Sequence, residues 1–457
     1  MDRLTAEDRL MLWPDQLWPQ EIGALAILDG RPLLYPDGRL RINAVRQAVE
    51  ARLHLVPRFR QVLNVPRRGL GGPMWVDDPG FDVAEHVRVT NVPAPANDAA
   101  LLSVTEELRR CRLDRSRPLW DMWFLTGLPD QRIGLFARMH HAIADGIAGV
   151  ATLGAFFDVS ADTPSGTARP WTPARMPPSR ALIADNIRRH AAGLGGALSH
   201  LARPTDTMRH IRDACPTVRS IFFASPTPRT SLDQTIGPDR ALAIIRGNLD
   251  LTKRAAHRHD AKVNDVVLDI TAAGLDALLR SRGETAKDLA LPVYVPVTLR
   301  RAQDRDDARG NMIGQMIVSV PIGECDPGAR LEQIAVAATR QKESSHPNLG
   351  TLFRSRLVRM ALLALLQRHP VSVTTADVPG PPHAVYFAGA RLLEVFPVLP
   401  LIANVTIGVG ALSYAGQFNI GVVADQDAIP DLVTFVAAAQ DELSALCEPE
   451  SAPHASP

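Results

Sequence analysis

The pattern of apolar and polar positions predicts alternating strands and helices along most of this 457-residue chain. Residues 23–29 are almost entirely apolar, as in a buried strand, and the apolar residues of 42–53 recur at the spacing of one helix face. A second helix is expected over 98–111, with further strands near 118–125 and 132–138. The first part of the chain is therefore predicted to be an α/β domain.

The same order of elements starts again after a stretch that is rich in proline and glycine. Residues 160–180 have the proline, serine and threonine content of a linker, and the residues that follow are basic and broken by glycine and proline. From residue 241 a strand is followed by a long helix that starts near Asn264, and the alternation continues to a closing helix over 430–446. We expect an N-terminal domain, a crossover with helices and a C-terminal domain, spanning residues 1–180, 181–235 and 236–457.

Composition and charge narrow the class of protein. Hydrophobic residues make up 46% of the chain and charged residues 22%, as in globular proteins that bury a core. The 50 basic and 49 acidic residues leave a formal charge of +1, so no long-range field attracts nucleic acid. The sequence therefore predicts a folded protein without a nucleic-acid partner.

The cysteines and the N-terminal residues indicate the cellular compartment in which the protein is expected. The four cysteines are far apart and form neither a CxxC metal pair nor a disulfide framework, which is typical of reduced thiols in the cytoplasm. The first residues are polar where a signal peptide is apolar, and no run reaches the roughly 18 apolar residues of a spanning helix. Residues 352–366 form a basic amphipathic segment, suited either to an anionic membrane surface or to packing on its own domain. We expect a cytoplasmic protein, with peripheral contact to the inner face of a membrane or to lipid droplets as an open alternative.

One polar, reactive segment interrupts the apolar pattern at a strand-to-helix junction, residues 140–146 with the sequence HHAIADG, called the motif below. Neighbouring side chains of an extended segment point to opposite faces, so only one of His140 and His141 can face a given site. A histidine there is suited to take a proton from a hydroxyl or amine nucleophile, and Gly146 lets the backbone turn into the helix. The alternative is that both histidines are buried core residues and Asp145 is only a helix cap.

Other reaction classes find less support in the sequence. A zinc site on the motif would need a helix through both ligands, but residues 133–139 are predicted to be a strand, so we expect no metal. The chain has no GxSxG, no P-loop and no GxGxxG after a strand, which disfavours serine hydrolases, NTPases and dinucleotide enzymes. Proton transfer by a histidine is the favoured chemistry.

The motif and an ordered set of further segments resemble the bacterial wax ester synthase/acyl-CoA:diacylglycerol acyltransferase family, whose signature is HHxxxDG. The resemblance covers nearly the whole chain and includes PRFR at 57–60, WVDDPGFD at 75–82, RPLW at 117–120, NDVVL at 264–268, PVTLR at 296–300 and VPGP at 378–381. HHxxxDG alone is shared with condensation domains of peptide synthetases, whereas the ordered set is far more specific to this family.

The resemblance implies a two-domain CoA-dependent acyltransferase fold, in which two related mixed-sheet α/β sandwiches hold the active site in the cleft between them. It implies that His141 is the general base and that an alcohol attacks the acyl-CoA thioester directly, with acyl-CoA as co-substrate and without an acyl-enzyme, metal or cofactor. In this superfamily the aspartate at the position of Asp145 usually pairs with an arginine and braces the motif, and Arg300 is our candidate for that arginine. Asn264 and Thr298 are candidates for the polar groups that stabilise the oxyanion.

The implied activity is transfer of a long acyl chain from acyl-CoA to a hydrophobic alcohol. Diacylglycerol, which would give triacylglycerol, is favoured over a fatty alcohol, which would give a wax ester. The alternatives are a condensation-type or polyketide-associated acyltransferase with a carrier-bound donor, and a non-catalytic lipid-binding paralogue. The chain departs from the family at Ala376-Asp377, where a Ser/Thr-Asn pair is common, and at Gln20-Glu21, where Met-His is common. The first departure bears on acceptor preference if those side chains line the acceptor channel.

Overall fold

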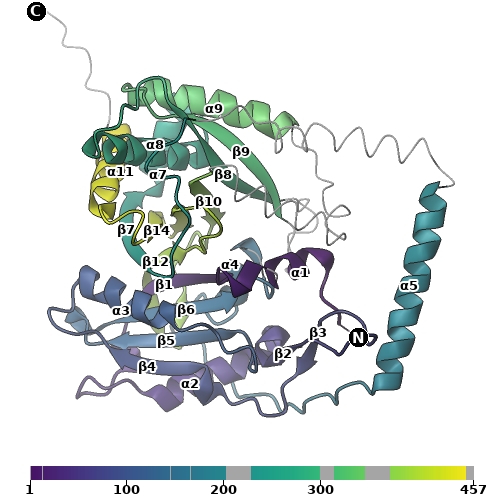
Figure 1. The fold of residues 1–457 in the computed structure, drawn as a ribbon. Coiled ribbons are helices and arrows are strands. Elements are labelled where there is room, and N and C mark those ends of the chain that lie inside the picture. The colour runs from purple at the N-terminus through teal and green to yellow at the C-terminus, as the bar shows by residue number, and fades with distance from the viewer. Residues whose placement is uncertain are drawn as a thin grey trace, which may run out of the picture.

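The computed structural model describes residues 2–12, 14–144, 146–164, 166–201, 228–298, 313–344 and 371–448. Within these ranges the chain forms two six-stranded sheets and a two-stranded ribbon of β2 (Gln61–Asn64) and β3 (Met74–Asp77). The two sheets and their helices make two stacked bodies in Figure 1. The basic segment 352–366 lies outside the described residues, so its contact with a membrane stays a prediction.

The first sheet is built around the strand that ends at the motif, and its order is β11-β12-β1-β6-β5-β4. Its strands span Glu21–Asp29 (β1), Val87–Asn91 (β4), Trp120–Thr126 (β5), Arg132–His140 (β6), Tyr386–Phe387 (β11) and Ala390–Val398 (β12). Along β1, Leu25 and Ile27 pack with α3 (Asp98–Arg110), whereas Ala26 and Leu28 pack with α2 (Ile42–Arg52). The two helices therefore cover opposite faces, and the sheet is buried on both sides.

The second sheet has the order β7-β14-β13-β10-β8-β9. Its strands span Arg240–Asn248 (β7), Ala290–Thr298 (β8), Ile313–Pro321 (β9), Val373–Pro379 (β10), Ile407–Tyr414 (β13) and Gln417–Asp425 (β14). Its helices are α7 (Leu249–Arg258), α8 (Val263–Ser281), α9 (Pro327–Ser344) and α11 (Leu432–Cys447), and they gather around this sheet in Figure 1. Val293 and Val295 of β8 are fully buried in the core that these helices share with the sheet.

Strand β12 joins the two halves of the chain, because it belongs to the second half by sequence but pairs with β1 of the first sheet. At its end Pro397 crosses the second sheet so closely that a Cβ at Gly421 would lie 1.9 Å from the Pro397 carbonyl oxygen. Only glycine permits that approach of two backbones. The crossover therefore fixes the position of one sheet against the other.

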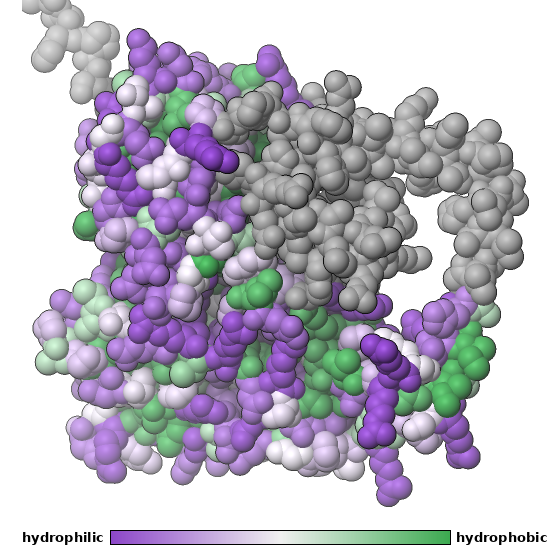
Figure 2. All heavy atoms as spheres, viewed as in Figure 1, coloured by the Kyte–Doolittle hydropathy of each residue, from purple (hydrophilic) through white to green (hydrophobic). Residues whose placement is uncertain are grey.

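The remaining elements are further helices. They are α1 (Ala6–Leu12), α4 (Gly146–Gly154), α5 (Ser179–Leu201) and the short 3-10 helices Pro14–Gln16 (η1), Arg31–Leu33, Leu53–Leu55, Pro57–Arg60, Val83–Glu85 and Pro129–Gln131. Helix α5 stands apart from both sheets in Figure 1, and its first turns are held by a bond of 2.9 Å from Arg3 Nε to Asp185 Oδ2. On the face of the molecule drawn in Figure 2, apolar side chains gather on the lower part, over the first half of the chain.

Candidate active site

The motif lies where β6 ends and α4 begins. His140 is the last residue of β6, residues 141–144 form a turn, and Gly146 starts α4. The turn is fixed by its backbone, because the His141 N–H donates to the Gln20 carbonyl at 2.7 Å and the Ile143 N–H donates to the His140 carbonyl at 2.9 Å. Asp145 lies outside the described residues.

The two histidines of the motif differ in their surroundings. His140 is 2% exposed, and its Nδ1 accepts a hydrogen bond of 3.0 Å from the Ala142 N–H. Its Nε2 lies 3.1 Å from Asp15 Oδ1, a close electrostatic contact whose geometry is not that of an aligned hydrogen bond. His141 follows in the turn and is half-buried. Both ring nitrogens of His140 therefore face neighbouring groups of the fold, and His141 lies beyond the end of the strand.

A buried group of charges supports the strand just before the motif. The Arg138 guanidinium donates two bonds of 2.9 Å to the Asp121 carboxylate and one of 2.8 Å to Glu21 Oε2. Burial alone would lower the pKa of Arg138, but these two carboxylates raise it above its usual value. The ion pairs thus link the ends of β1, β5 and β6 behind the histidines. Sequence reasoning missed this group, although a charged residue within the apolar run of a strand is a signal for it.

The second sheet opens next to the motif. Strand β10 pairs with β13 along its whole length but with β8 only at Val373 and Thr374. Beyond these residues β10 lies near α4, and a Cβ at Gly146 would be 3.7 Å from Val378 Cγ2. Because side chains alternate along a strand, Ala376 shares the face of Val378, and Asp377 points to the other face. The strand face beside the motif is therefore apolar.

The other predicted site residues lie on the second half of the chain. Asn264 is the second residue of α8 and is half-buried, and Thr298 is the last residue of β8. Arg300 lies outside the described residues, as Asp145 does, so their ion pair stays a prediction. The structure thus brings His140, His141 and Gly146 together at one junction and leaves the roles of Asn264 and Thr298 as predictions.

Asp377 is a half-buried acid of β10, on the face opposite Ala376 and Val378. It continues the buried face of Val373 and Thr375, and burial raises the pKa of Asp377 to about 6. No hydrogen bond or ion pair joins its carboxylate to another group in the part of the chain that the structure describes. Ionising this carboxylate in the folded protein is therefore unfavourable.

We expect Asp377→Asn to stabilise the protein above pH 6. The folded-state pKa exceeds the usual value, so the folded protein binds more protons than the unfolded chain between about pH 4 and pH 6, and stability falls as the pH rises through this window. The variant should gain about 1–2 kcal/mol in free energy of unfolding at pH 8 and little at pH 4, measured by urea titration. Asp441→Asn on the exposed face of α11 is the control, and an equal change in both variants would contradict the prediction.

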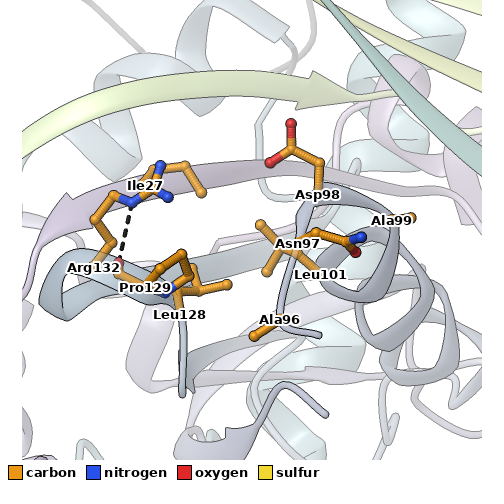
Figure 3. Close-up of a pocket in the computed structure, with 9 residues that line it drawn as sticks. All are labelled: Ile27, Ala96, Asn97, Asp98, Ala99, Leu101, Leu128, Pro129 and Arg132. Atoms are coloured by element: carbon orange, nitrogen blue, oxygen red, sulfur yellow. Dashed lines mark hydrogen bonds between the residues drawn. The ribbon is translucent and has the colours of Figure 1, made fainter. Parts of the chain in front are cut away.

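A surface cavity of about 400 Å³ lies at the opposite end of the first sheet (Figure 3). It is lined by Ile27, Ala96, Asn97, Asp98, Ala99, Leu101, Leu128, Pro129 and Arg132. Ile27 is paired with Gly134, six residues along β6 from His140, which corresponds to about 20 Å along the strand. This cavity is therefore separate from the motif.

Comparison with known proteins bears on the family and the fold. A family model described as the wax ester synthase/diacylglycerol acyltransferase catalytic domain matches residues 4–267, and the WS/DGAT C-terminal domain matches residues 309–447. A probable diacylglycerol O-acyltransferase of Mycobacterium tuberculosis is 29% identical over 438 residues, covering 93% of this chain and 90% of that protein. A putative diacylglycerol O-acyltransferase of Mycobacterium bovis gives the same values.

Two solved structures share the fold. The wax ester synthase/diacylglycerol acyltransferase from Marinobacter aquaeolei VT8 superposes with a TM-score of 0.68 at 23% identity, covering 97% of this chain and 98% of that one. The starter condensation domain of rhizomide synthetase, in complex with C8-CoA, gives a TM-score of 0.60 at 15% identity, covering 97% and 95%. The predicted CoA-dependent acyltransferase fold and the predicted class of enzyme, an acyltransferase, are confirmed. The chain belongs to the wax ester synthase/diacylglycerol acyltransferase family.

Proposed function

We propose that this protein transfers a long acyl chain from acyl-CoA to a hydrophobic alcohol, with diacylglycerol as the preferred acceptor. The observation that carries the proposal is the junction of β6 and α4, where both ring nitrogens of His140 face neighbouring groups of the fold and His141 follows in the turn, beyond the end of the strand. The resemblance assigns the general base to the second histidine of the motif, and this position of His141 supports that role.

The proposed reaction is a direct transfer. The His141 ring takes the hydroxyl proton of the alcohol while the alcohol oxygen bonds to the thioester carbonyl carbon, which gives a tetrahedral intermediate. The intermediate collapses to the ester, the carbon–sulfur bond breaks, and the leaving CoA thiolate takes the proton from His141. The oxyanion needs hydrogen-bond donors in the cleft, and Asn264 and Thr298 are the proposed ones. In this scheme no covalent acyl-enzyme forms.

The relatives and the second sheet support a hydrophobic acceptor. The mycobacterial relatives carry the name diacylglycerol O-acyltransferase. The face of β10 beside the motif presents Ala376 and Val378 where the family commonly has a polar side chain at the first of these positions. An apolar wall suits the acyl chains of diacylglycerol, because it offers no hydrogen-bonding group that would need a partner.

Exposed apolar side chains on α5 also support peripheral contact with a lipid surface. In the described part of the chain no helix has the length and apolarity to cross a membrane. Ile183 and Ile187 lie one turn apart on α5 and are 44% and 62% exposed. Exposed apolar side chains on a helix that stands away from the body support contact with a membrane or droplet that holds the acceptor.

An acceptor screen tests the proposed function. The purified protein is incubated with labelled palmitoyl-CoA and with dioleoylglycerol, hexadecanol or water, and palmitoyl carrier protein replaces the CoA donor in a parallel series. We expect labelled triacylglycerol, at a rate about tenfold above that of wax ester, and no transfer from the carrier protein. Transfer only from the carrier protein would support a condensation-type reaction, and no ester with any pair would support a lipid-binding paralogue.

A further inference from the structure

Asp15 is a buried acid that faces the motif from a segment remote in sequence. It lies in η1 (Pro14–Gln16), and its side chain is 12% exposed. Its Oδ1 accepts a hydrogen bond of 2.8 Å from the Gln20 N–H and lies 3.1 Å from His140 Nε2. Its Oδ2 accepts from the Arg115 guanidinium. Asp15 therefore contacts both the histidine and the segment that leads into β1.

The contacts of His140 select one form of its ring. The Ala142 N–H points at Nδ1, so this nitrogen must present its lone pair, and the neutral ring carries its hydrogen on Nε2. That hydrogen is on the side of the Asp15 carboxylate. A second proton on Nδ1 would set two N–H groups against each other and break the bond to Ala142. An acid beside one nitrogen of a histidine fixes the tautomer and the orientation of the ring.

A second route leads from Asp15 to His141. Asp15 accepts a hydrogen bond from the Gln20 N–H, and the carbonyl of the same Gln20 accepts a hydrogen bond of 2.7 Å from the His141 N–H. Asp15 thus contacts the turn that carries His141 in two ways. One runs through the His140 ring, which accepts from the Ala142 N–H, and the other through the backbone of Gln20. Two independent connections make the position of His141 sensitive to this one carboxylate.

We propose that Asp15 is the positioning residue of the motif, which holds His140 as its Nε2–H tautomer and thereby sets the turn that presents His141. This inference rests on the proposed function, because it assigns His141 as the base. The groups around the carboxylate fit the role. Burial alone would raise the pKa of Asp15, but its contact with His140 and its hydrogen bonds from the Gln20 N–H and the Arg115 guanidinium hold it well below its usual range. Asp15 is therefore an anion throughout the physiological pH range.

The test compares Asp15→Ala and Asp15→Asn with a matched control, Asp158→Asn. Asp158 is equally buried, at 13% exposed, and pairs with Arg52 in the first half of the chain. We expect Asp15→Ala to lower kcat for acyl transfer about 100-fold with KM for acyl-CoA within about twofold of wild type, because the reacting geometry is lost and binding is not. Asp15→Asn keeps an oxygen acceptor and should lose about tenfold or less. Asp158→Asn should lower Tm as Asp15→Asn does and leave kcat unchanged.

A second measurement is independent of activity. In protein labelled with ¹⁵N-histidine, with His140 assigned through His140→Gln, the ring nitrogens should report the Nε2–H tautomer in the wild type and a smaller fraction of it in Asp15→Ala, where the Ala142 N–H alone favours this form. The proposal is overturned if His140 keeps the same fraction of the Nε2–H tautomer without Asp15, or if Asp15→Ala retains wild-type kcat. If the wild type forms no ester with any acceptor, the proposed function fails, and the nitrogen shifts still decide whether Asp15 positions His140.

Discussion

Replacing His141 with alanine is expected to lower kcat by about 10²–10⁴-fold, the usual contribution of a positioned general base. The side chain is half-buried in a turn whose backbone is held by Gln20 and His140, so its removal leaves those hydrogen bonds in place. Tm should therefore stay within a few degrees of the wild-type value. The measurement is the rate of triacylglycerol formation under saturating acyl-CoA, together with a thermal melt of each variant.

The two controls separate loss of the base from loss of the turn. His54 is also half-buried, and its Nδ1 lies 2.8 Å from the Ala51 carbonyl away from the motif, so His54→Ala should retain full activity. His140→Ala removes a buried ring that the fold contacts on both nitrogens, and it should lower both Tm and kcat. Wild-type turnover in His141→Ala with an inactive but stable His140→Ala would reverse the assignment of the two histidines.

The strand-to-helix junction was predictable because its signal is local. An apolar run before the motif predicted β6, and helical spacing after it predicted α4, so the place of His140 and His141 followed from neighbours in sequence. The same holds for α3, expected over 98–111 and observed over Asp98–Arg110. Periodicity reports which face of a helix is buried, and the buried residues Leu101, Val104 and Thr105 of α3 recur at that spacing.

The partners of the motif were not predictable in this way. Asp15 lies beside His140 and accepts a hydrogen bond from Arg115, so these contacts join segments a hundred residues or more apart in sequence, and no spacing rule connects them. Strand β12 was expected as a strand, but its pairing with β1 of the other half depends on the whole chain. Glu21 stood out only as a departure from the family, and the structure gives it a role as an ion-pair partner of Arg138. Sequence patterns thus located the motif and missed the groups that hold it.

A second buried charge group lies in the second half of the chain and joins its helices. Arg330 of α9 is 3% exposed and lies between two acids from neighbouring helices. Its Nε donates to Asp269 Oδ1 of α8 at 2.7 Å, and its Nη2 lies 2.6 Å from Glu442 Oε1 of α11. Its Nη1 donates to the Glu324 carbonyl at 2.9 Å. One guanidinium therefore joins three helices.

We expect Arg330→Leu to lower the free energy of unfolding by about 3–5 kcal/mol at pH 8, because it leaves two buried carboxylates without their cation. Burial is the main cause that raises the pKa of Asp269 to about 7; the nearby Glu442 contributes in the same direction, and Arg330 opposes the shift. Urea titration followed by tryptophan fluorescence measures the change. Arg280→Leu is the control on α8, since the Arg280–Asp276 pair is exposed and should contribute less than about 1 kcal/mol.

The pH dependence distinguishes loss of charge pairing from loss of packing. Since the folded-state pKa of Asp269 exceeds the usual value, the folded protein binds more protons than the unfolded chain between about pH 4 and pH 7, and this group's contribution to stability falls as the pH rises through that window. In Arg330→Leu the acids can be neutralised by protonation, so the loss should be smaller at pH 5 than at pH 8. Asp269→Asn keeps an oxygen for Arg330 and should flatten the dependence between these pH values. A loss in Arg330→Leu that is the same at both pH values would show that the guanidinium acts through packing and not through its charge.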